Sequence, residues 1–421
     1  MTAPASGLSS VTERFLRYAA IESASDPDAT DRVPSTASQW NVLRVLHEEL
    51  LALGLTDAEV HEPSAAVMAT LPATPGHEHA PVVGFLAHVD VSPELGSRTP
   101  KPILHKAWDG RDLVLPDDPT AVVSRRTDPE LEHCIGHDLI TASGTTLLGA
   151  DDKSGVAAIM TAVERMRRDP SLVHGPVRIG FTTDEEIGMG ARNFDVARFA
   201  CHCAYTLDSH AVGRLEAETF SADAMVVVFK GHNTHPGSAH GVMVNSIKVA
   251  ADFVSRLPRH TLAPENTQGT EGFVHPNDVR ASVDRTEVHF IVRDFVTAEL
   301  KVKEEMLRRL AEDTVKDWPG SSVTCEVSET YRNMREVLDR HPKVLEHART
   351  AIRRTGREPI EGRIRGGTDG SILSERGLPT PNLSSGQHAI HSRLEWASVQ
   401  EMEIAAETIV QLCDLWARET R

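Results

Sequence analysis

Histidine and carboxylate residues, the types that bind metal ions, follow several apolar segments of this sequence. Residues 81–87 are apolar and run directly into His88-Val89-Asp90. Residues i and i+2 of an extended chain share a face, so Asp90 can accept the spare ring proton of His88 and fix which ring nitrogen faces a metal. A core histidine satisfied by a neighbouring aspartate would have the same sequence. His88 alone therefore does not establish a site.

A pair of aspartates occurs at a second such place. Asp151 and Asp152 lie between Gly149 and Gly155, at the start of a helical pattern over residues 156–166. Carboxylates at a helix start are common caps, so a structural explanation is available. Small neighbours nevertheless allow another group to approach the backbone closely. An aspartate held there can bridge two cations.

A third cluster, Asp184-Glu185-Glu186, follows the apolar residues 177–181. Three adjacent carboxylates repel one another, and metal cations would remove that repulsion. An exposed acidic loop is the alternative explanation. Because adjacent side chains point in different directions, one glutamate can ligate a metal while the other is free to handle protons.

Asp208 follows a fourth apolar run at residues 204–207, and the coincidence of the four positions carries more weight than any one of them. In open α/β sheets the binding crevice lies outside the carboxyl ends of the strands. If there were no metal site, each of the four positions would need its own, independent structural explanation. The positions that share this place are His88, Asp151, the Glu185-Glu186 pair and Asp208.

Two histidines near the end of the sequence are further candidates. His388 and His391 lie in the segment HAIHSRLE, with Glu395 closing it. The residue pattern does not choose between the two histidines, and it does not reject a structural role for both.

The elements that must hold these residues form an α/β pattern. Short runs that are apolar on both faces, at residues 81–87, 177–181 and 204–207, predict strands of a mainly parallel sheet. A capping-box pattern, Ser10 to Glu13, predicts an opening amphipathic helix, and a second helix is expected over about 38–53. The fold class predicted is α/β, with a mainly parallel-sheet catalytic domain covered by helices.

The pattern changes at about residue 216, where alternating strands such as 224–229 and 287–293 appear. After about residue 331 the sequence again shows the loop-and-helix pattern of the N-terminal part. We therefore expect a smaller α+β domain, residues 216–330, inserted into a metal-binding catalytic domain formed by residues 1–215 and 331–421. The inserted domain is expected to act as a lid or as a dimerisation surface of a homodimer.

Composition narrows the class of protein. The chain carries 44 basic and 61 acidic residues, a net charge of −17, and no basic run with interleaved aromatics, so we expect no nucleic-acid partner. No apolar run approaches the roughly 20 residues of a membrane-spanning helix, and the N-terminus lacks a signal-peptide pattern. The five cysteines are scattered and fit reduced thiols. We expect a cytoplasmic protein with no membrane partner.

The ordered motifs resemble those of peptidase T, the tripeptide aminopeptidase family within the two-zinc aminoacylase and glutamate carboxypeptidase superfamily. The likeness covers nearly the whole chain. It implies a hydrolase of peptide catabolism, a metalloprotease that removes the N-terminal residue from short peptides with a free N-terminus, above all tripeptides. The motifs that carry it include GFLAHVD, TTLLGADDKSG, FTTDEEIGMGA, AYTLDS, HPGSAHGVMVNSI, IVRDF, RGGTDGS and NLSSGQHAIHSRLEW.

The resemblance assigns the metal ligands position by position. Asp151 would bridge two zinc ions. His88 and Asp208 would complete one site, and Glu186 and His391 would complete the other. A shell of His, Asp and Glu without cysteine suits Zn²⁺, and also Co²⁺ or Mn²⁺.

The resemblance also assigns the groups that handle protons and hold the substrate. Glu185 matches the family's general base, and Asp90 matches the partner that orients His88. In the inserted domain, His235 resembles a lid histidine that helps to hold the developing oxyanion. The residues in motifs that resemble those binding the peptide's backbone and carboxylate are Asn245, Arg293 and Arg365.

One departure from the family pattern bears on the substrate. Ser209-His210-Ala211 stands where a glycine-rich stretch is expected, so restriction to tripeptides is less secure than peptide hydrolysis. A related two-zinc dipeptidase or deacylase on the same scaffold is the alternative enzyme. A noncatalytic metal-dependent peptide-binding protein is the alternative from another class, and it would be expected to lack Glu185.

Overall fold

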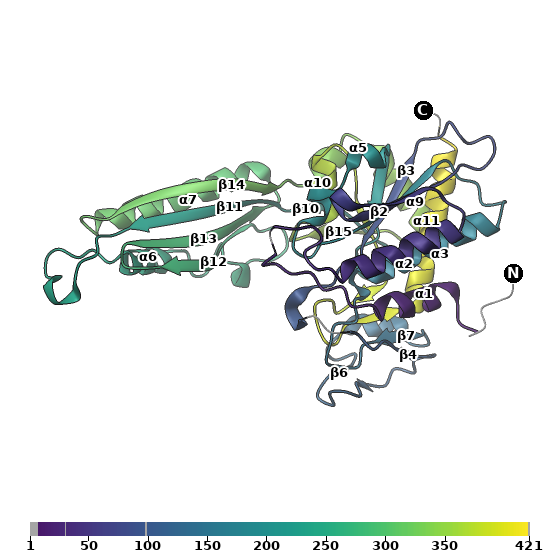
Figure 1. The fold of residues 1–421 in the computed structure, drawn as a ribbon, viewed down its shortest axis with the longest axis horizontal. Helices are drawn as coiled ribbons and strands as arrows, with labels where there is room; N and C mark the ends of the chain where they lie inside the picture. Colours follow the sequence, from purple (N-terminus) through teal and green to yellow (C-terminus); the bar gives the residue numbers. More distant parts are fainter. Residues whose placement is uncertain (1–6, 30, 97–98, 420–421) are drawn as a thin grey trace. The chain divides into compact units, whose positions relative to one another are not determined.

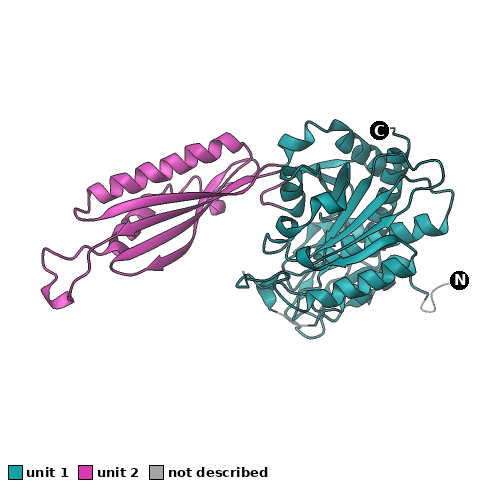
Figure 2. Cartoon of the chain, turned by 45° about the horizontal axis from the view of Figure 1, so that its top comes forward, with its two compact units in different colours: residues 1–217, 334–362, 368–421 teal, residues 218–333, 363–367 magenta. Residues whose placement is uncertain are grey.

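The computed structural model describes residues 7–29, 31–96 and 99–419. The chain forms two compact units, shown in different colours in Figure 2. Unit 1 contains Met1–Ala217, Met334–Gly362 and Thr368–Arg421, and unit 2 contains Glu218–Asn333 and Arg363–Gly367. The sequence analysis predicted one continuous inserted segment at residues 216–330, whereas unit 2 also includes Arg363–Gly367. No helix in the described part of the chain is both long and apolar enough to cross a membrane.

Unit 1 is built on an eight-stranded sheet with the order β1-β2-β8-β3-β9-β16-β10-β15. β3 pairs in parallel with β8 and β9, and β9 pairs in parallel with β16. The pairs β1/β2, β2/β8 and β10/β16 are antiparallel. The α/β class predicted from the sequence is therefore confirmed, with the parallel strands at the centre. The strands are β1 (Thr56–His61), β2 (Ala66–Leu71), β3 (Val83–His88), β8 (Val177–Thr182), β9 (Cys203–Thr206), β10 (Arg214–Thr219), β15 (Ile360–Ile364) and β16 (Asn382–Leu383).

Helices cover both faces of this sheet, because its central strands are apolar on both sides. On one face Leu86 of β3 and Ala204 of β9 pack against helices α4, α5 and α10. On the other face Phe85 stacks on Tyr205, whose hydroxyl is bound by Trp416 of α11. α3 lies against β3 and α11 (Figure 1). The helices are α3 (Ala150–Arg168), α4 (Gly190–Asn193), α5 (Val196–Phe199), α8 (Arg335–Leu338), α9 (Pro342–Arg354), α10 (Asp369–Glu375) and α11 (Val399–Ala417).

The two N-terminal helices form near the expected positions, as α1 (Ser10–Ala19) and α2 (Gln39–Ala52). The capping box expected from Ser10 to Glu13 is wrong, because the N-cap residue is Ser9 and its side chain makes no capping bond. The Ser10 hydroxyl instead donates to the carboxylate of Glu164 in α3. Arg14 Nη1 also donates to Glu164, to Oε2 at 2.7 Å. Tertiary contacts between α1 and α3 have thus replaced the local cap.

Two small sheets border the large one in unit 1. One has the order β17-β18-β7-β4 and the other pairs β5 with β6. Trp108, Leu115, Leu131 and Trp396 are part of the apolar cluster beneath them. Residues 389–395, which include His391, form the turn between β17 and β18. The strands are β4 (Ile103–His105), β5 (Leu113–Val114), β6 (Val122–Val123), β7 (Leu139–Thr141), β17 (Gln387–His388) and β18 (Trp396–Ser398).

Unit 2 is an antiparallel sheet with the order β12-β13-β11-β14. The residues of β13 alternate between more and less buried positions, as a sheet with one packed face requires. Met225, Phe253, Phe290 and Leu307 belong to the core between this face and the two helices. The elements are β11 (Ser221–Lys230), β12 (Phe273–Ala281), β13 (Arg285–Asp294), β14 (Ser322–Tyr331), α6 (Ser246–Ser255) and α7 (Thr297–Lys316).

Candidate active site

The candidate ligands gather at one edge of the large sheet because three neighbouring parallel strands end there. β3 ends in His88, β8 runs into Glu185 and Glu186, and β9 runs into Asp208. β8, β3 and β9 are adjacent, so their carboxyl ends lie side by side. Asp151 reaches the same edge from the start of α3, where Asp151 and Asp152 have non-helical dihedral angles.

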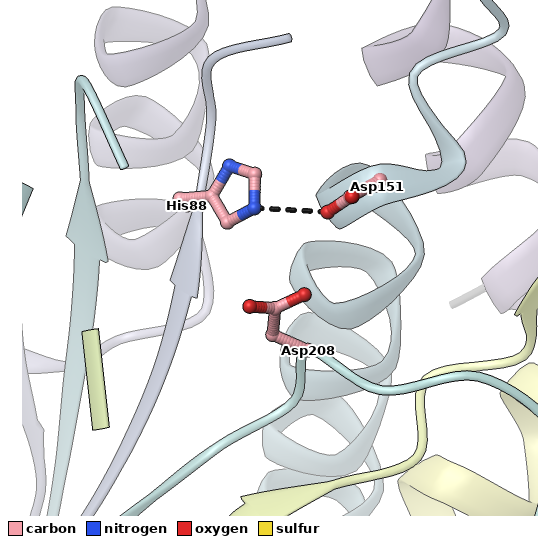
Figure 3. A group of neighbouring side chains, drawn as sticks. All are labelled: His88, Asp151 and Asp208. Atoms are coloured by element: carbon pink, nitrogen blue, oxygen red, sulfur yellow. Dashed lines mark hydrogen bonds and ion pairs between the residues drawn. The ribbon is translucent and has the colours of Figure 1, made fainter. Parts of the chain in front are cut away.

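The first ligand group consists of His88, Asp151 and Asp208, whose ligand atoms all lie within 4.8 Å of one another. His88 Nε2 is 3.0 Å from Asp151 Oδ1. Figure 3 shows these side chains facing one another from the end of β3, the start of α3 and the segment after β9. Gln387 Nε2 donates to Asp208 Oδ1 at 3.1 Å, which fixes the orientation of that carboxylate.

The second ligand group consists of Asp151, Glu186 and His391, again with ligand atoms within 4.8 Å of one another. His391 Nε2 is 2.9 Å from Glu186 Oε2 and 3.3 Å from Asp151 Oδ2. Asp151 therefore turns Oδ1 toward the first group and Oδ2 toward the second. This is the geometry of a carboxylate that can bridge two cations.

The charges of the site fit bound cations. Burial raises the pKa of Asp208 well above its ordinary value, and the charge of Asp151 raises it further. Burial, together with Asp151, raises the pKa of Glu186 to about 7. The Oε1 atom of Glu186 is buried and has no hydrogen-bond partner among the described residues. An unpaired buried carboxylate oxygen is costly, and a metal ion would remove that cost.

Asp90 orients both His88 and the turn that carries the two glutamates. The His88 Nδ1 atom is 3.3 Å from Asp90 Oδ1, while its Nε2 faces Asp151. The two carboxylate oxygens of Asp90 also accept the backbone N–H groups of Glu185, at 3.0 Å, and Glu186, at 3.2 Å. The fully buried Asp90 thus couples one ligand of each metal group.

Sequence reasoning missed the residues that fix the turn after β8. Asp184 has a positive φ of 60°, which is uncommon for a residue other than glycine. Its carboxylate accepts Ser35 N at 2.7 Å and Gln39 Nε2 at 2.6 Å, and Gln39 Oε1 accepts Asp184 N at 3.1 Å. These contacts hold the conformation that turns Glu185 and Glu186 toward Asp90. Asp184 differs from Glu186 in that Ser35 and Gln39 bind its carboxylate and it belongs to neither ligand group.

Glu395 fixes the backbone of the segment that carries Asp151. Its buried carboxylate accepts the backbone N–H groups of Leu148 at 2.6 Å, Gly149 at 2.9 Å and Asp151 at 3.0 Å. Burial raises the pKa of Glu395 to about 7. The segment that presents the shared aspartate is therefore fixed by a residue from the loop that also carries His391.

The two late histidines have different surroundings. His391 belongs to the second ligand group. His388 is buried, stacks on Trp396 with ring centroids 3.8 Å apart, and contacts Glu401 through Nε2. His388 takes part in neither ligand group of the described residues. Its role is to pack the small sheet that borders the site.

Glu185 lies beside the site without belonging to either ligand group. Its backbone N–H is bound by Asp90, and burial raises the pKa of its side chain well above the ordinary value. The departure at Ser209-His210-Ala211 also adjoins the ligands, since it follows Asp208 directly. The Ser209 carbonyl accepts both the N–H and the hydroxyl of Ser385, which ties this segment to the strand carrying Gln387.

Four of the candidate residues lie in unit 2. His235 is exposed and its Nδ1 accepts the N–H of Gly237, and Asn245 caps helix α6 by accepting Ile247 N. Arg365 donates to the carbonyls of Gly269 and Glu271 and lies over the Phe220 ring. Arg293 lies over the Phe273 ring, and its buried Nε has no hydrogen-bond partner among the described residues.

Comparison with known proteins defines the class. The profile of Peptidase family M20/M25/M40 matches residues 146–414. In fold, the chain resembles the aminopeptidase PepT from Bacillus cereus ATCC 10987, with a TM-score of 0.74 at 22% identity over 97% of this chain and 98% of that one. It also resembles a tripeptidase from Staphylococcus aureus, with a TM-score of 0.74 at 20% identity, covering 97% of this chain and 98% of that one. Fold and profile together make this molecule a peptidase of that broad class.

Relatives of higher sequence identity define the family within that class. Peptidase T from Geobacillus kaustophilus (strain HTA426) is 44% identical over 407 residues, which cover 97% of this chain and 98% of the relative. Peptidase T from Desulfitobacterium hafniense (strain DSM 10664 / DCB-2) is 42% identical, over 98% of this chain and 99% of the relative. The chain belongs to the peptidase T family. The resemblance drawn from the motifs is thereby confirmed.

Proposed function

We propose that this protein is a two-metal aminopeptidase that releases the N-terminal residue of short peptides, with tripeptides as its main substrates. The observation that carries the proposal is the position of Asp151, which offers one carboxylate oxygen to each of two ligand groups. Two metal ions held on either side of one carboxylate form a hydrolytic site of the kind that aminopeptidases share with other two-metal enzymes. The ligand set of histidine, aspartate and glutamate favours Zn²⁺, with Co²⁺ or Mn²⁺ as substitutes.

Each residue of the site has a separate proposed role in metal binding or proton transfer. His88 and Asp208 would hold one ion, Glu186 and His391 would hold the other, and Asp151 would contribute to both. When bound, the ions supply Lewis acidity, which polarises a carbonyl and lowers the pKa of a water molecule. Glu185, beside the ligand groups, would act as the general base that accepts the proton of the attacking water and returns it to the leaving amine. Asp90 keeps His88 in the tautomer whose Nε2 is free to ligate.

The proposal includes the cellular compartment of the enzyme and the molecules it binds. The five cysteines are all free in the structure, which favours a reducing compartment, so we infer that the protein works in the cytoplasm. The acidic surface, with a net charge of −17, argues against nucleic acid as a partner. Substrates would be short peptides with a free N-terminus.

A substrate panel tests the proposal. Free tripeptides, N-acetylated tripeptides and dipeptides would be incubated with the purified protein, with and without a chelator, and the products identified by mass spectrometry. The proposal expects release of the N-terminal residue from free tripeptides only when metal is present. Preferential cleavage of dipeptides or of the acetyl group would instead favour the related dipeptidase or deacylase.

Removal of the metals should abolish hydrolysis, because four ligands, of which only His391 is exposed, surround one shared carboxylate. We expect the metal-free protein to regain activity on addition of Zn²⁺, Co²⁺ or Mn²⁺, and to reach its maximum only after the second equivalent. Titration of the metal-free protein with simultaneous activity and metal analysis checks this. Full activity with one ion or fewer per chain would refute the two-metal proposal.

Unit 2 is proposed to act as a lid, with Asn245, Arg293 and Arg365 binding the peptide and His235 holding the oxyanion. Such a donor acts mainly in the transition state, so His235→Ala should lower kcat roughly 100- to 1,000-fold with a smaller change in KM. His240→Ala is the matched control, since His240 is also exposed in the same loop. Near-normal kcat in His235→Ala with both metals present would remove the chemical support for the lid.

A further inference from the structure

A second carboxylate follows the strand that carries His88 and reaches the other metal group. Glu94 lies in the short 3-10 turn Pro93–Leu95, a few residues after β3 ends at His88. Its Oε1 is 3.2 Å from Nδ1 of His391. The opposite ring nitrogen of His391, Nε2, faces Glu186 and Asp151. Glu94 therefore contacts His391 on the side away from the proposed metal.

This arrangement repeats the one at His88. There Nε2 faces Asp151 and Nδ1 faces Asp90. A neutral imidazole that ligates a metal through Nε2 must carry its proton on Nδ1, and that N–H needs an acceptor. Asp90 provides the acceptor for His88, through its backbone carbonyl at 3.2 Å and its carboxylate at 3.3 Å, and the Glu94 carboxylate provides it for His391.

The backbone around Glu94 is held in place. Val91 N donates to Ser23 O at 3.2 Å, and Ser25 N donates to Val91 O at 3.0 Å, so the segment after β3 is bound to the N-terminal loop. The Ser92 hydroxyl donates to Glu94 Oε2. The carboxylate is thus oriented with its other oxygen, Oε1, toward His391.

His391 has more need of such support than His88. His88 ends a buried strand, whereas His391 lies in the turn between β17 and β18 with a positive φ of 57°. The side chain of His391 is 37% exposed and that of His88 only 2%. A contact outside the ligand group is therefore the means by which the sequence can fix the His391 ring.

We propose that Glu94 is a positioning residue for His391, setting the tautomer and orientation of this ligand and so the metal affinity of the second group. The inference rests on the proposed two-metal function. Glu94, Glu186 and His391 also line one cavity of about 520 Å³, with Ile187 and Met189 on its apolar wall. The Glu94 side chain is 52% exposed, so water weakens the contact relative to that of the buried Asp90.

The test measures metal affinity, not turnover. Metal-free protein would be titrated with Zn²⁺ against a chromophoric chelator, giving two stepwise dissociation constants. Loss of an outer partner of a metal ligand costs roughly 10- to 100-fold in affinity, and the exposure of Glu94 places the expected loss for Glu94→Ala near 10-fold, at one site only. Glu94→Gln, which keeps an acceptor oxygen, should recover part of the loss.

Two further variants assign the effect. Glu132→Ala removes another carboxylate of similar exposure, 58% against 52%, that also contacts one basic side chain, and it should leave both constants unchanged. In a Glu186→Ala background, where only the first group remains intact, adding Glu94→Ala should have no further effect on the remaining site.

The outcomes separate this inference from the proposed function. Failure of the unaltered protein to bind two ions would refute the two-metal function itself. Two unchanged constants in Glu94→Ala would overturn the role of Glu94 alone. A raised KM with unchanged metal affinity would also overturn it, because Glu94 would then act on the substrate and not on His391.

Discussion

Glu185→Ala should lower kcat by roughly 100- to 10,000-fold while the protein keeps both metal ions. This range is the contribution of a general base positioned next to its proton. Glu185 belongs to neither ligand group, and only its backbone N–H is tied to Asp90. Its side chain can therefore be removed without disturbing the turn. Steady-state kinetics on a free tripeptide, with metal analysis of the same sample, checks the prediction.

Glu186→Ala is the matched control, because Glu186 is the next residue on the same turn and its N–H is bound by the same aspartate. This variant should lose metal from the second group, since Glu186 Oε2 faces His391. Adding excess metal should restore part of its activity but none of the activity of Glu185→Ala. Interchanged behaviour of the two variants would show that the roles of this adjacent pair were assigned the wrong way round.

Asp151→Ala should weaken both metal sites together and leave no measurable hydrolysis. Asp151 offers Oδ1 to the group containing His88 and Oδ2 to the group containing His391. The affinity of each site should fall by more than the roughly 100-fold that loss of an outer partner can cost, because a ligand itself is removed. Calorimetric titration of the metal-free variant with Zn²⁺ measures both sites.

His88→Ala and His391→Ala are the comparison for Asp151. Each histidine belongs to one group only, so each variant should lose mainly one ion. If Asp151→Ala lost a single ion, as the histidine variants should, Asp151 would be a terminal ligand and the bridging geometry would be wrong.

The sequence brings candidate ligands to one place where local pattern and topology coincide. His88, Glu186 and Asp208 all follow apolar runs, and the ends of neighbouring parallel strands must meet at one sheet edge. The antiparallel outer strands were not foreseen, because a buried apolar run does not reveal the direction of its neighbour. The capping box predicted at Ser10 is wrong for a similar reason. The Ser10 hydroxyl binds Glu164, which is 154 residues away in sequence and so is not part of any local pattern.

Contacts between distant residues explain what the sequence analysis missed at the site. Asp184 has the same chemistry as its two neighbours, and only its contacts with Ser35, 149 residues away, and Gln39 distinguish it from a ligand. Glu94 lies on the surface and looks like any solvated glutamate until the turn carrying His391 is placed beside it. Neither role could be read from periodicity or spacing.

The central claim is that one aspartate is shared by two metal ions, and anomalous X-ray diffraction at the zinc edge tests it most directly. Crystals of the zinc-loaded protein should show two peaks about 3.5 to 4 Å apart, a separation that lets two ions act together on one substrate. One peak should lie among His88, Asp151 and Asp208, and the other among Asp151, Glu186 and His391. A single peak, or two peaks of which only one contacts Asp151, would contradict the account.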